Sequence, residues 1–165
     1  MSKKAEILEG LGGFVPALRR YARALVAGAG AGLADDCVQN TLQSIGARLR
    51  ARELQPADLG EARIEAYAAL TAMAGKRLAR STRSAAPHHP PIVQGLAELG
   101  FEERAALLLV SLEGMSYDAA ARVLGTSRET LLARLMRARA ALGGEGLLPA
   151  EPGARRATAH LRVVK

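Results

Sequence analysis

Residues 116–142 read SYDAAARVLGTSRETLLARLMRARAAL and contain two helix starts separated by a turn. Ser116 and Ser127 each stand where a helix N-cap is expected, and Gly125 permits a tight turn between the two helices. Ala121 is small enough for the helices to approach each other closely. This spacing predicts a helix-turn-helix, with an ordinary helical hairpin as the alternative.

The second helix of this motif has a predicted buried side and a predicted outward side. The buried seam consists of Leu131, Leu135, Ala138 and Leu142, which recur at helical spacing. The same geometry places Glu129, Ala133, Met136 and Ala140 on the outward side, with Leu132 beside them. In a DNA-binding motif of this kind, the N-terminal residues of the second helix face base edges and arginines hold phosphates. The candidate DNA-binding residues are therefore Ser127, Arg128, Thr130, Arg134, Arg137 and Arg139.

The outward side is also a candidate protein-binding surface. A surface that meets DNA should be polar, whereas Leu132, Ala133 and Met136 are apolar. Exposed Leu and Met at helical spacing are more typical of a surface that binds another protein.

Composition predicts an all-α protein of two small modules. The 165 residues are 49% hydrophobic but only 3% aromatic, which favours helices that pack through small side chains. Prolines within STRSAAPHHPP, residues 81–91, cannot continue a helix and indicate a linker. We therefore expect a helical module over residues 8–84, a linker over 85–92, a helix-turn-helix module over 93–143 and a flexible basic tail over 144–165.

Apolar periodicity predicts the helices of both modules. In the first module they span residues 11–26, 35–52 and 59–83, and in the second 93–99, 102–112, 117–124 and 128–142. Asp35 and Asp36 are expected in the first turn of their helix, where negative charge is favourable. The basic end of the third helix, with Lys76, Arg77 and Arg80, is either a helix C-terminus or a phosphate-facing patch.

Bulk properties narrow the function classes. The formal charge of +7 favours a polyanionic or acidic partner. Cys37, the single cysteine, is expected to be a buried thiol rather than a reactive one. No signal peptide or long apolar run is present, which predicts a cytoplasmic protein without membrane contact. His88 and His89 lack metal-ligand neighbours, and no phosphate loop or catalytic set converges, so we expect no metal, no cofactor and no enzyme activity.

The sequence around the helix-turn-helix resembles a known family. Residues 99–142, LGFEERAALLLVSLEGMSYDAAARVLGTSRETLLARLMRARAAL, are similar to region 4 of extracytoplasmic-function sigma factors. There, R-x-x-x-L-L-x-x-L-E-G-x-S-Y precedes a recognition helix that ends in R-x-R-A-x-L. Upstream, VPALRRYARALV at 15–26 and ADDCVQNTLQSI at 34–45 look like the first helices of region 2.

This resemblance implies partners for each module. Region 2 would bind core RNA polymerase and melt promoter DNA, region 4 would read the second promoter element, and an anti-sigma factor would be a further partner. By the resemblance, Asp36, Gln39 and Asn40 would face the polymerase, with Asn40 where Glu is usual. A solvated helix turn is the alternative for these residues.

Two departures from the family bear on function. Promoter melting needs aromatic side chains that capture flipped bases, yet residues 61–80 offer only Tyr67. Tyr67 falls on the apolar stripe, which favours core packing over base capture. In the recognition helix, Leu132 stands where the family usually has Lys or Arg, and Ala133 and Met136 stand near its usual Ser.

These departures suggest a second resemblance, to the sigma-like module of alphaproteobacterial general stress response regulators. That module does not bind DNA but mimics a sigma factor and captures its anti-sigma factor; the 165 residues here contain no phosphoacceptor receiver domain of the kind those regulators carry. Because the recognition helix keeps its arginines and the Ser116-Tyr117 start is intact, the sequence predicts a DNA-binding initiation factor, with a sigma-factor mimic as the alternative. The apolar outward side favours a mimic.

Overall fold

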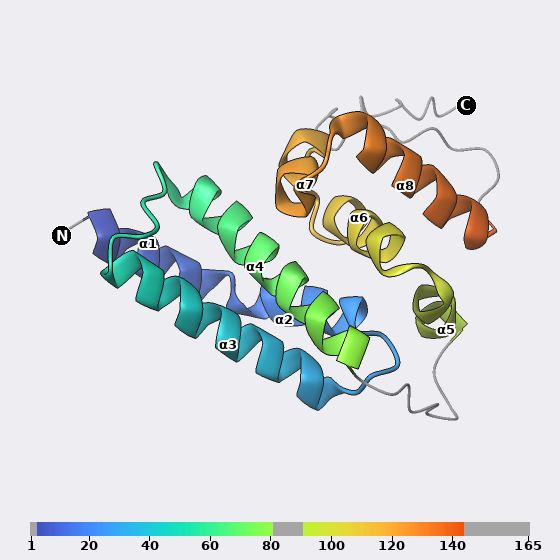
Figure 1. The fold of residues 1–165 in the computed structure, drawn as a ribbon, viewed down its shortest axis with the longest axis horizontal. Helices are drawn as coiled ribbons and strands as arrows, with labels where there is room; N and C mark the ends of the chain where they lie inside the picture. Colours follow the sequence, from blue (N-terminus) through green and yellow to red (C-terminus); the bar gives the residue numbers. More distant parts are fainter. Residues whose placement is uncertain (1–2, 81–90, 144–165) are drawn as a thin grey trace, which may run out of the picture.

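A computed structural model describes residues 3–80 and 91–143 of the chain. Within these residues the secondary structure is entirely helical, which confirms the predicted fold class. The helices are α1 Lys3–Gly13, α2 Val15–Leu25, α3 Ala31–Arg50, α4 Leu59–Arg80, α5 Pro91–Glu98, α6 Phe101–Ser111, α7 Tyr117–Leu124 and α8 Arg128–Ala141. Figure 1 shows α1–α4, the N-terminal module, on one side and α5–α8, the C-terminal module, on the other. His88, His89 and the predicted tail lie outside the described residues.

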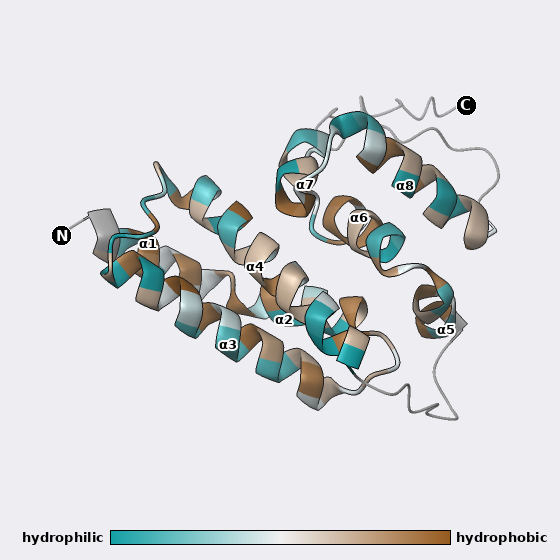
Figure 2. Cartoon of the chain, in the orientation of Figure 1, coloured by the Kyte–Doolittle hydropathy of each residue, from teal (hydrophilic) through white to brown (hydrophobic). Residues whose placement is uncertain are grey.

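The N-terminal module is built on amphipathic helices. Along α2, α3 and α4, hydrophilic and hydrophobic residues interchange so that each helix has an apolar side (Figure 2). Tyr21 of α2 and Tyr67 of α4 are fully buried, and their ring centroids lie 5.2 Å apart in an edge-to-face arrangement. Leu18 and Ile45 are also buried in this core. The prediction that Tyr67 packs in the core is therefore confirmed.

The prediction of one helix over residues 11–26 was wrong. The chain forms two helices there, interrupted at Phe14, and α1 begins at Lys3, before the expected module start at residue 8. Pro16 lies at the start of α2, where its missing N–H costs nothing, which explains why a new helix begins at this point. α1 buries Ile7 and Leu11, and it packs on α4.

The start of α3 also differs from the prediction. The helix begins at Ala31, directly after Gly30 with its φ of +92°, so its first turn contains no acidic residue. Asp35 and Asp36 therefore lie inside the helix and not in its first turn. Asp35 instead pairs with two arginines of α2, at 3.5 Å from Arg23 and 3.9 Å from Arg19. The glycine-rich run ended earlier than expected because Gly32 adopts helical geometry.

Smaller differences concern the linker and the helix bounds, whereas the cysteine agrees with the prediction. α5 begins at Pro91, within the predicted linker, because Pro is well suited to a first helical position. The bounds of α6 and α8 differ from the predicted ones by a residue, and those of α7 agree. Cys37 is buried, as expected, and burial raises the pKa of its thiol.

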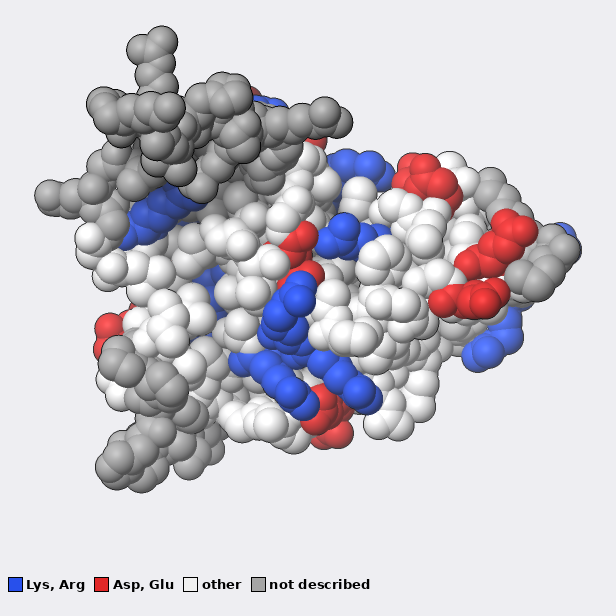
Figure 3. Space-filling view, turned by 180° about the vertical axis from the view of Figure 1, so that it is seen from behind, with Lys and Arg blue, Asp and Glu red and all other residues white. Residues whose placement is uncertain are grey.

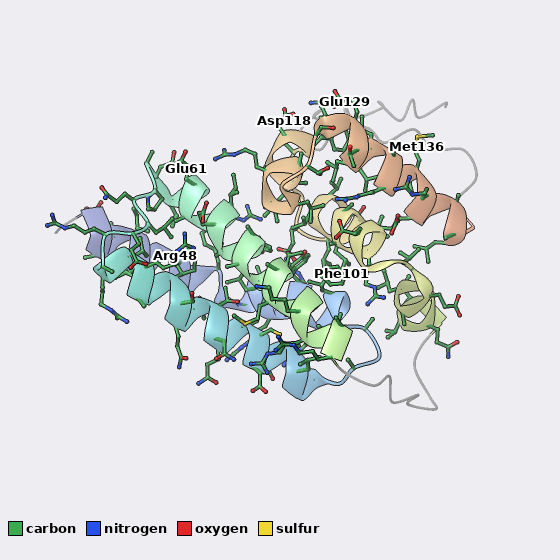
Figure 4. The ribbon with its side chains drawn as sticks, viewed as in Figure 1. Arg48, Glu61, Phe101, Asp118, Glu129 and Met136 are labelled. Atoms are coloured by element: carbon green, nitrogen blue, oxygen red, sulfur yellow. The ribbon has the colours of Figure 1, made fainter. Side chains whose placement is uncertain are left out.

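The two modules pack against each other through α2 on α6 and α4 on α7. Gly75 of α4 allows the Phe101 ring of α6 to approach, since a Cβ there would lie 3.1 Å from Cε1 of Phe101 (Figure 4). Beside this contact lies an open cavity of about 1000 Å³, lined by the end of α4 and by α5 and α6. No described helix has the length and apolar character needed to cross a membrane.

Candidate functional site

Helices α7 and α8 form the predicted helix-turn-helix. The Ser116 hydroxyl accepts a hydrogen bond from the Ala119 amide at 3.2 Å, and the Ser127 hydroxyl accepts one from the Thr130 amide at 3.2 Å. Between the helices, Gly125 has φ +58° and ψ +37°, a left-handed conformation that glycine adopts without steric cost. Two separate helices therefore meet at a turn, and α8 lies at the surface of the module (Figure 1).

The buried seam of α8 is shorter than the sequence predicts. Leu131, Leu135 and Ala138 are completely buried against the rest of the C-terminal module. Leu142 is 37% exposed, which contradicts its assignment to the seam. The reason is that α8 ends at Ala141, and the short helix α5 covers Leu142 only partly: a Cβ at Gly95 would lie 2.9 Å from Cδ2 of Leu142.

The outward side of α8 is the apolar surface that the sequence indicates. Glu129, Ala133, Met136 and Ala140 are all exposed, and Met136 is 64% exposed. Figure 4 shows Glu129 and Met136 on the side of α8 that points away from the molecule. Leu132 is half-buried beside them and packs partly on the core. Glu129 lies in the first turn of α8, where hydrogen bonds from its own backbone N–H and from Ser127 lower the pKa of its carboxyl.

Arginines on α8 form ion pairs within their own module. Arg134 lies 2.7 Å from Glu102 and Arg137 lies 3.1 Å from Glu103, both acids belonging to the first turn of α6. Arg134 is held tightly, with only 18% of its side chain exposed, while Arg137 is 60% exposed. The sequence analysis missed these α6 partners, because no pattern within α8 indicates them.

The start of α8 is held by a similar pair. Arg128 donates to both carboxylate oxygens of Asp118 at 3.2 Å and stacks over the Tyr117 ring at 5.3 Å. Arg139 is half-buried near the end of the helix. Ser127 and Thr130 are exposed, although the Ser127 hydroxyl is engaged in the cap. The candidate DNA-binding residues thus lie along α8 and at its N-cap, but several of the arginines among them form ion pairs with carboxylates.

The proposed polymerase-facing residues form a short strip on α3. Asp36 and Gln39 are exposed, and Asn40 donates a hydrogen bond to the Asp36 carbonyl at 2.7 Å. On the face opposite to that of Figure 1, Lys and Arg side chains gather near the middle and are interleaved with Asp and Glu (Figure 3). Among the described residues seen on this face, the positive charge is therefore not arranged as one uninterrupted stripe.

Two buried charged residues were missed by the sequence analysis. Arg104 of α6 is 4% exposed and donates to the carbonyls of Leu25, Ala97 and Leu99. Glu113, in the turn after α6, has a side chain only 1% exposed. No local pattern indicates these contacts, because Leu25, which Arg104 reaches on α2, and the partners of Glu113 on α2 and α4 lie far away in sequence.

Comparison with known proteins identifies the modules. The sigma2 domain of PhyR matches residues 11–71, and sigma-70 region 4 matches residues 91–142. The chain is a sigma-factor-like protein. Its N-terminal module corresponds to region 2 and its C-terminal module to region 4, as the sequence resemblance implies. The relatives are transcription regulators rather than enzymes. A search of curated proteins finds no match.

Solved structures with the same fold include complexes. This sigma-factor-like protein is 25% identical, with a TM-score of 0.62, to a structure of the sigma factor RpoE with the anti-sigma factor NepR from Bartonella quintana; 81% of this chain and 92% of that chain are covered. It is also 25% identical, with a TM-score of 0.63, to a PhyRSL-NepR complex from Sphingomonas sp. Fr1, covering 86% and 92%. CnrH, in complex with the cytosolic domain of CnrY, shares the fold at 23% identity and a TM-score of 0.59, covering 86% and 92%.

Proposed function

We propose that this sigma-factor-like protein acts as a sigma-factor mimic that binds an anti-sigma factor through the outward side of α8. The observation that carries the proposal is the apolar surface formed by Ala133, Met136 and Ala140, with Met136 64% exposed. A helix that enters the major groove needs donors and cations on its outward side, since DNA presents phosphates and polar base edges. An apolar helix face instead suits the apolar side of a partner helix.

The ion pairs of α8 support the same proposal. Binding of Arg134 or Arg137 to a phosphate would require separation from Glu102 or Glu103, which lie at 2.7 Å and 3.1 Å. Those carboxylates would also repel the phosphate backbone. In addition, Tyr67 is completely buried and so is not presented for stacking on a flipped base. A mimic needs neither phosphate contacts nor base capture.

The solved neighbours add a second line of support. Two of them are complexes with NepR, which in the Bartonella quintana structure is the anti-sigma factor bound to RpoE. Because the present chain shares their fold at 25% identity, NepR is a suitable first probe for the partner.

Replacing Met136 with Asp tests the proposal. Isothermal titration calorimetry of the full chain with Bartonella quintana NepR should give a measurable Kd for the unchanged chain. We expect Met136→Asp to weaken binding by about tenfold or more, because a buried anchor is lost and a charge is desolvated.

The matched control for this experiment is Ala47→Asp, which adds the same charge at an exposed position on α3. This control should bind like the unchanged chain. A Kd that is the same for Met136→Asp and the unchanged chain would refute a binding site on α8, provided that circular dichroism shows both variants folded.

The second candidate function is a DNA-binding initiation factor that joins core RNA polymerase. The formed helix-turn-helix, the 60% exposed Arg137 and the exposed Asp36 and Gln39 favour it. Under this alternative, the logarithm of the binding constant for promoter DNA should fall linearly with the logarithm of the salt concentration. Arg137→Ala would reduce the steepness of that line by about one. Under the proposed function, fluorescence anisotropy should detect no promoter-specific binding by the unchanged chain or by Arg137→Ala. Promoter-specific transcription with purified core polymerase would establish the second candidate instead.

A further inference from the structure

Glu113 is a buried carboxylate whose side-chain partners both lie on the other module. It follows α6 in the turn to α7, and its side chain is 1% exposed. Arg20 of α2 holds it with a forked arrangement: Nε and Nη2 lie 3.1 Å and 3.0 Å from Oε1, and Nη2 lies 3.1 Å from Oε2. The Tyr67 hydroxyl of α4 donates to Oε2 at 2.6 Å. The C-terminal module thus inserts a charge between two helices of the N-terminal module.

The site that receives Glu113 is held together by contacts within the N-terminal module. Tyr67 packs edge-to-face on Tyr21, whose hydroxyl lies 2.8 Å from Oγ1 of Thr71. Arg63 stacks over the Tyr67 ring at 5.5 Å and donates to the Glu113 carbonyl at 3.1 Å. Burial and the neighbouring carboxylate raise the pKa of Tyr67, so its hydroxyl keeps the proton that it donates. The backbone and side chain of Glu113 are therefore both fixed by α2 and α4.

A buried pair of this kind controls geometry more than it adds stability. If the modules separate, water can solvate Glu113, Arg20 and Tyr67, which offsets much of the attraction that is lost. If only one partner is removed, the closed arrangement leaves a buried polar group without its bond, and separation relieves that cost. Removal of Glu113 should therefore shift the modules toward an open arrangement, in which the Tyr67 hydroxyl can meet water.

We propose that Glu113 is the latch of an open–closed equilibrium between the two modules. Closure requires its carboxylate to enter the site between Arg20 and Tyr67, and this requirement fixes how α7 docks on α4. The open arrangement would expose the facing surfaces of α2, α4, α6 and α7 and the walls of the cavity between the modules. The latch concerns the chain itself, so it holds for a mimic and for an initiation factor alike.

Electron–electron double resonance on the full chain tests the latch. Spin labels are placed at two exposed positions, Ser44→Cys on α3 and Ala140→Cys on α8, in a Cys37→Ala background. The chain with Glu113 intact should show one narrow distance distribution. Glu113→Ala should broaden the distribution toward longer distances, with the ratio of open to closed molecules rising roughly tenfold.

A second variant removes the latch from the other module. Arg20→Gln should also open the modules, and it should not disturb folding because the Arg20 side chain is 55% exposed. The matched control is Glu65→Gln, which neutralises a carboxylate paired with Arg48 at 3.7 Å on the surface of the N-terminal module and should leave the distances unchanged. If Glu113→Ala does not fold by circular dichroism, Arg20→Gln decides the outcome. A narrow, unshifted distribution in the folded latch variants would overturn the proposal.

Discussion

Replacement of Leu131 by Ala should lower the free energy of unfolding by about 3 kcal/mol, because a large buried side chain is lost and a cavity remains. Leu131 is completely buried, on a helix that packs on α6 and α7. The loss should be visible as a lower midpoint in urea denaturation followed by circular dichroism. This substitution tests whether α8 is anchored by its seam, with the opposite side left free for a partner.

The control is the same substitution at Leu142. This residue is at the end of the same helix but 37% exposed, so Leu142→Ala should cost less than about 1 kcal/mol. The comparison removes differences in side-chain chemistry, since both variants delete the same atoms. Equal losses for the two variants would contradict the seam that the structure defines, and would restore the longer seam that the sequence predicts.

Features of the helix-turn-helix were predictable because they depend on neighbouring residues. A serine that caps a helix acts on an amide three residues away, and a left-handed glycine acts on its own backbone. The outward side of α8 follows from helical periodicity once Leu131 and Leu135 are assigned to the core. For these reasons the sequence predicted the turn at Gly125 and the exposure of Met136 correctly.

Features that depend on distant residues were not predictable. Leu142 has the right spacing for the seam, but its burial depends on how far α5, a separate helix, covers it. Asp35 looks like a helix-start residue, but it lies inside α3 and pairs with Arg19 and Arg23 on another helix, α2. The partners of Arg134 and Arg137 lie on α6, and those of Glu113 lie on α2 and α4, so no local pattern shows them. The ion pairs of Arg134 and Arg137, which weaken the case for DNA contacts, therefore could not be predicted from the sequence of α8.

Replacement of Arg104 by Met should lower the free energy of unfolding by about 3 kcal/mol, because buried carbonyl groups lose their donors. Its guanidinium donates at 2.8 Å to the Leu25 carbonyl, at 3.1 Å to that of Ala97 and at 2.9 Å to that of Leu99. Leu25 ends α2, where the last carbonyls have no partner within the helix. Met retains much of the side-chain volume, so the loss reports the missing hydrogen bonds more than a cavity.

Arg122→Met is the matched control for this effect, because Arg122 also connects the modules. Its Nη2 lies 3.8 Å from Oε1 of Glu61, and its side chain is 59% exposed, so water can replace the pair. The control should therefore cost less than about 1 kcal/mol in urea denaturation. A further variant, Arg104→Lys, keeps the charge but lacks the planar fork that reaches several carbonyls, and its stability should stay close to that of Arg104→Met. Recovery of full stability by Lys would mean that charge near the end of α2, rather than the directed hydrogen bonds, holds the modules at this point.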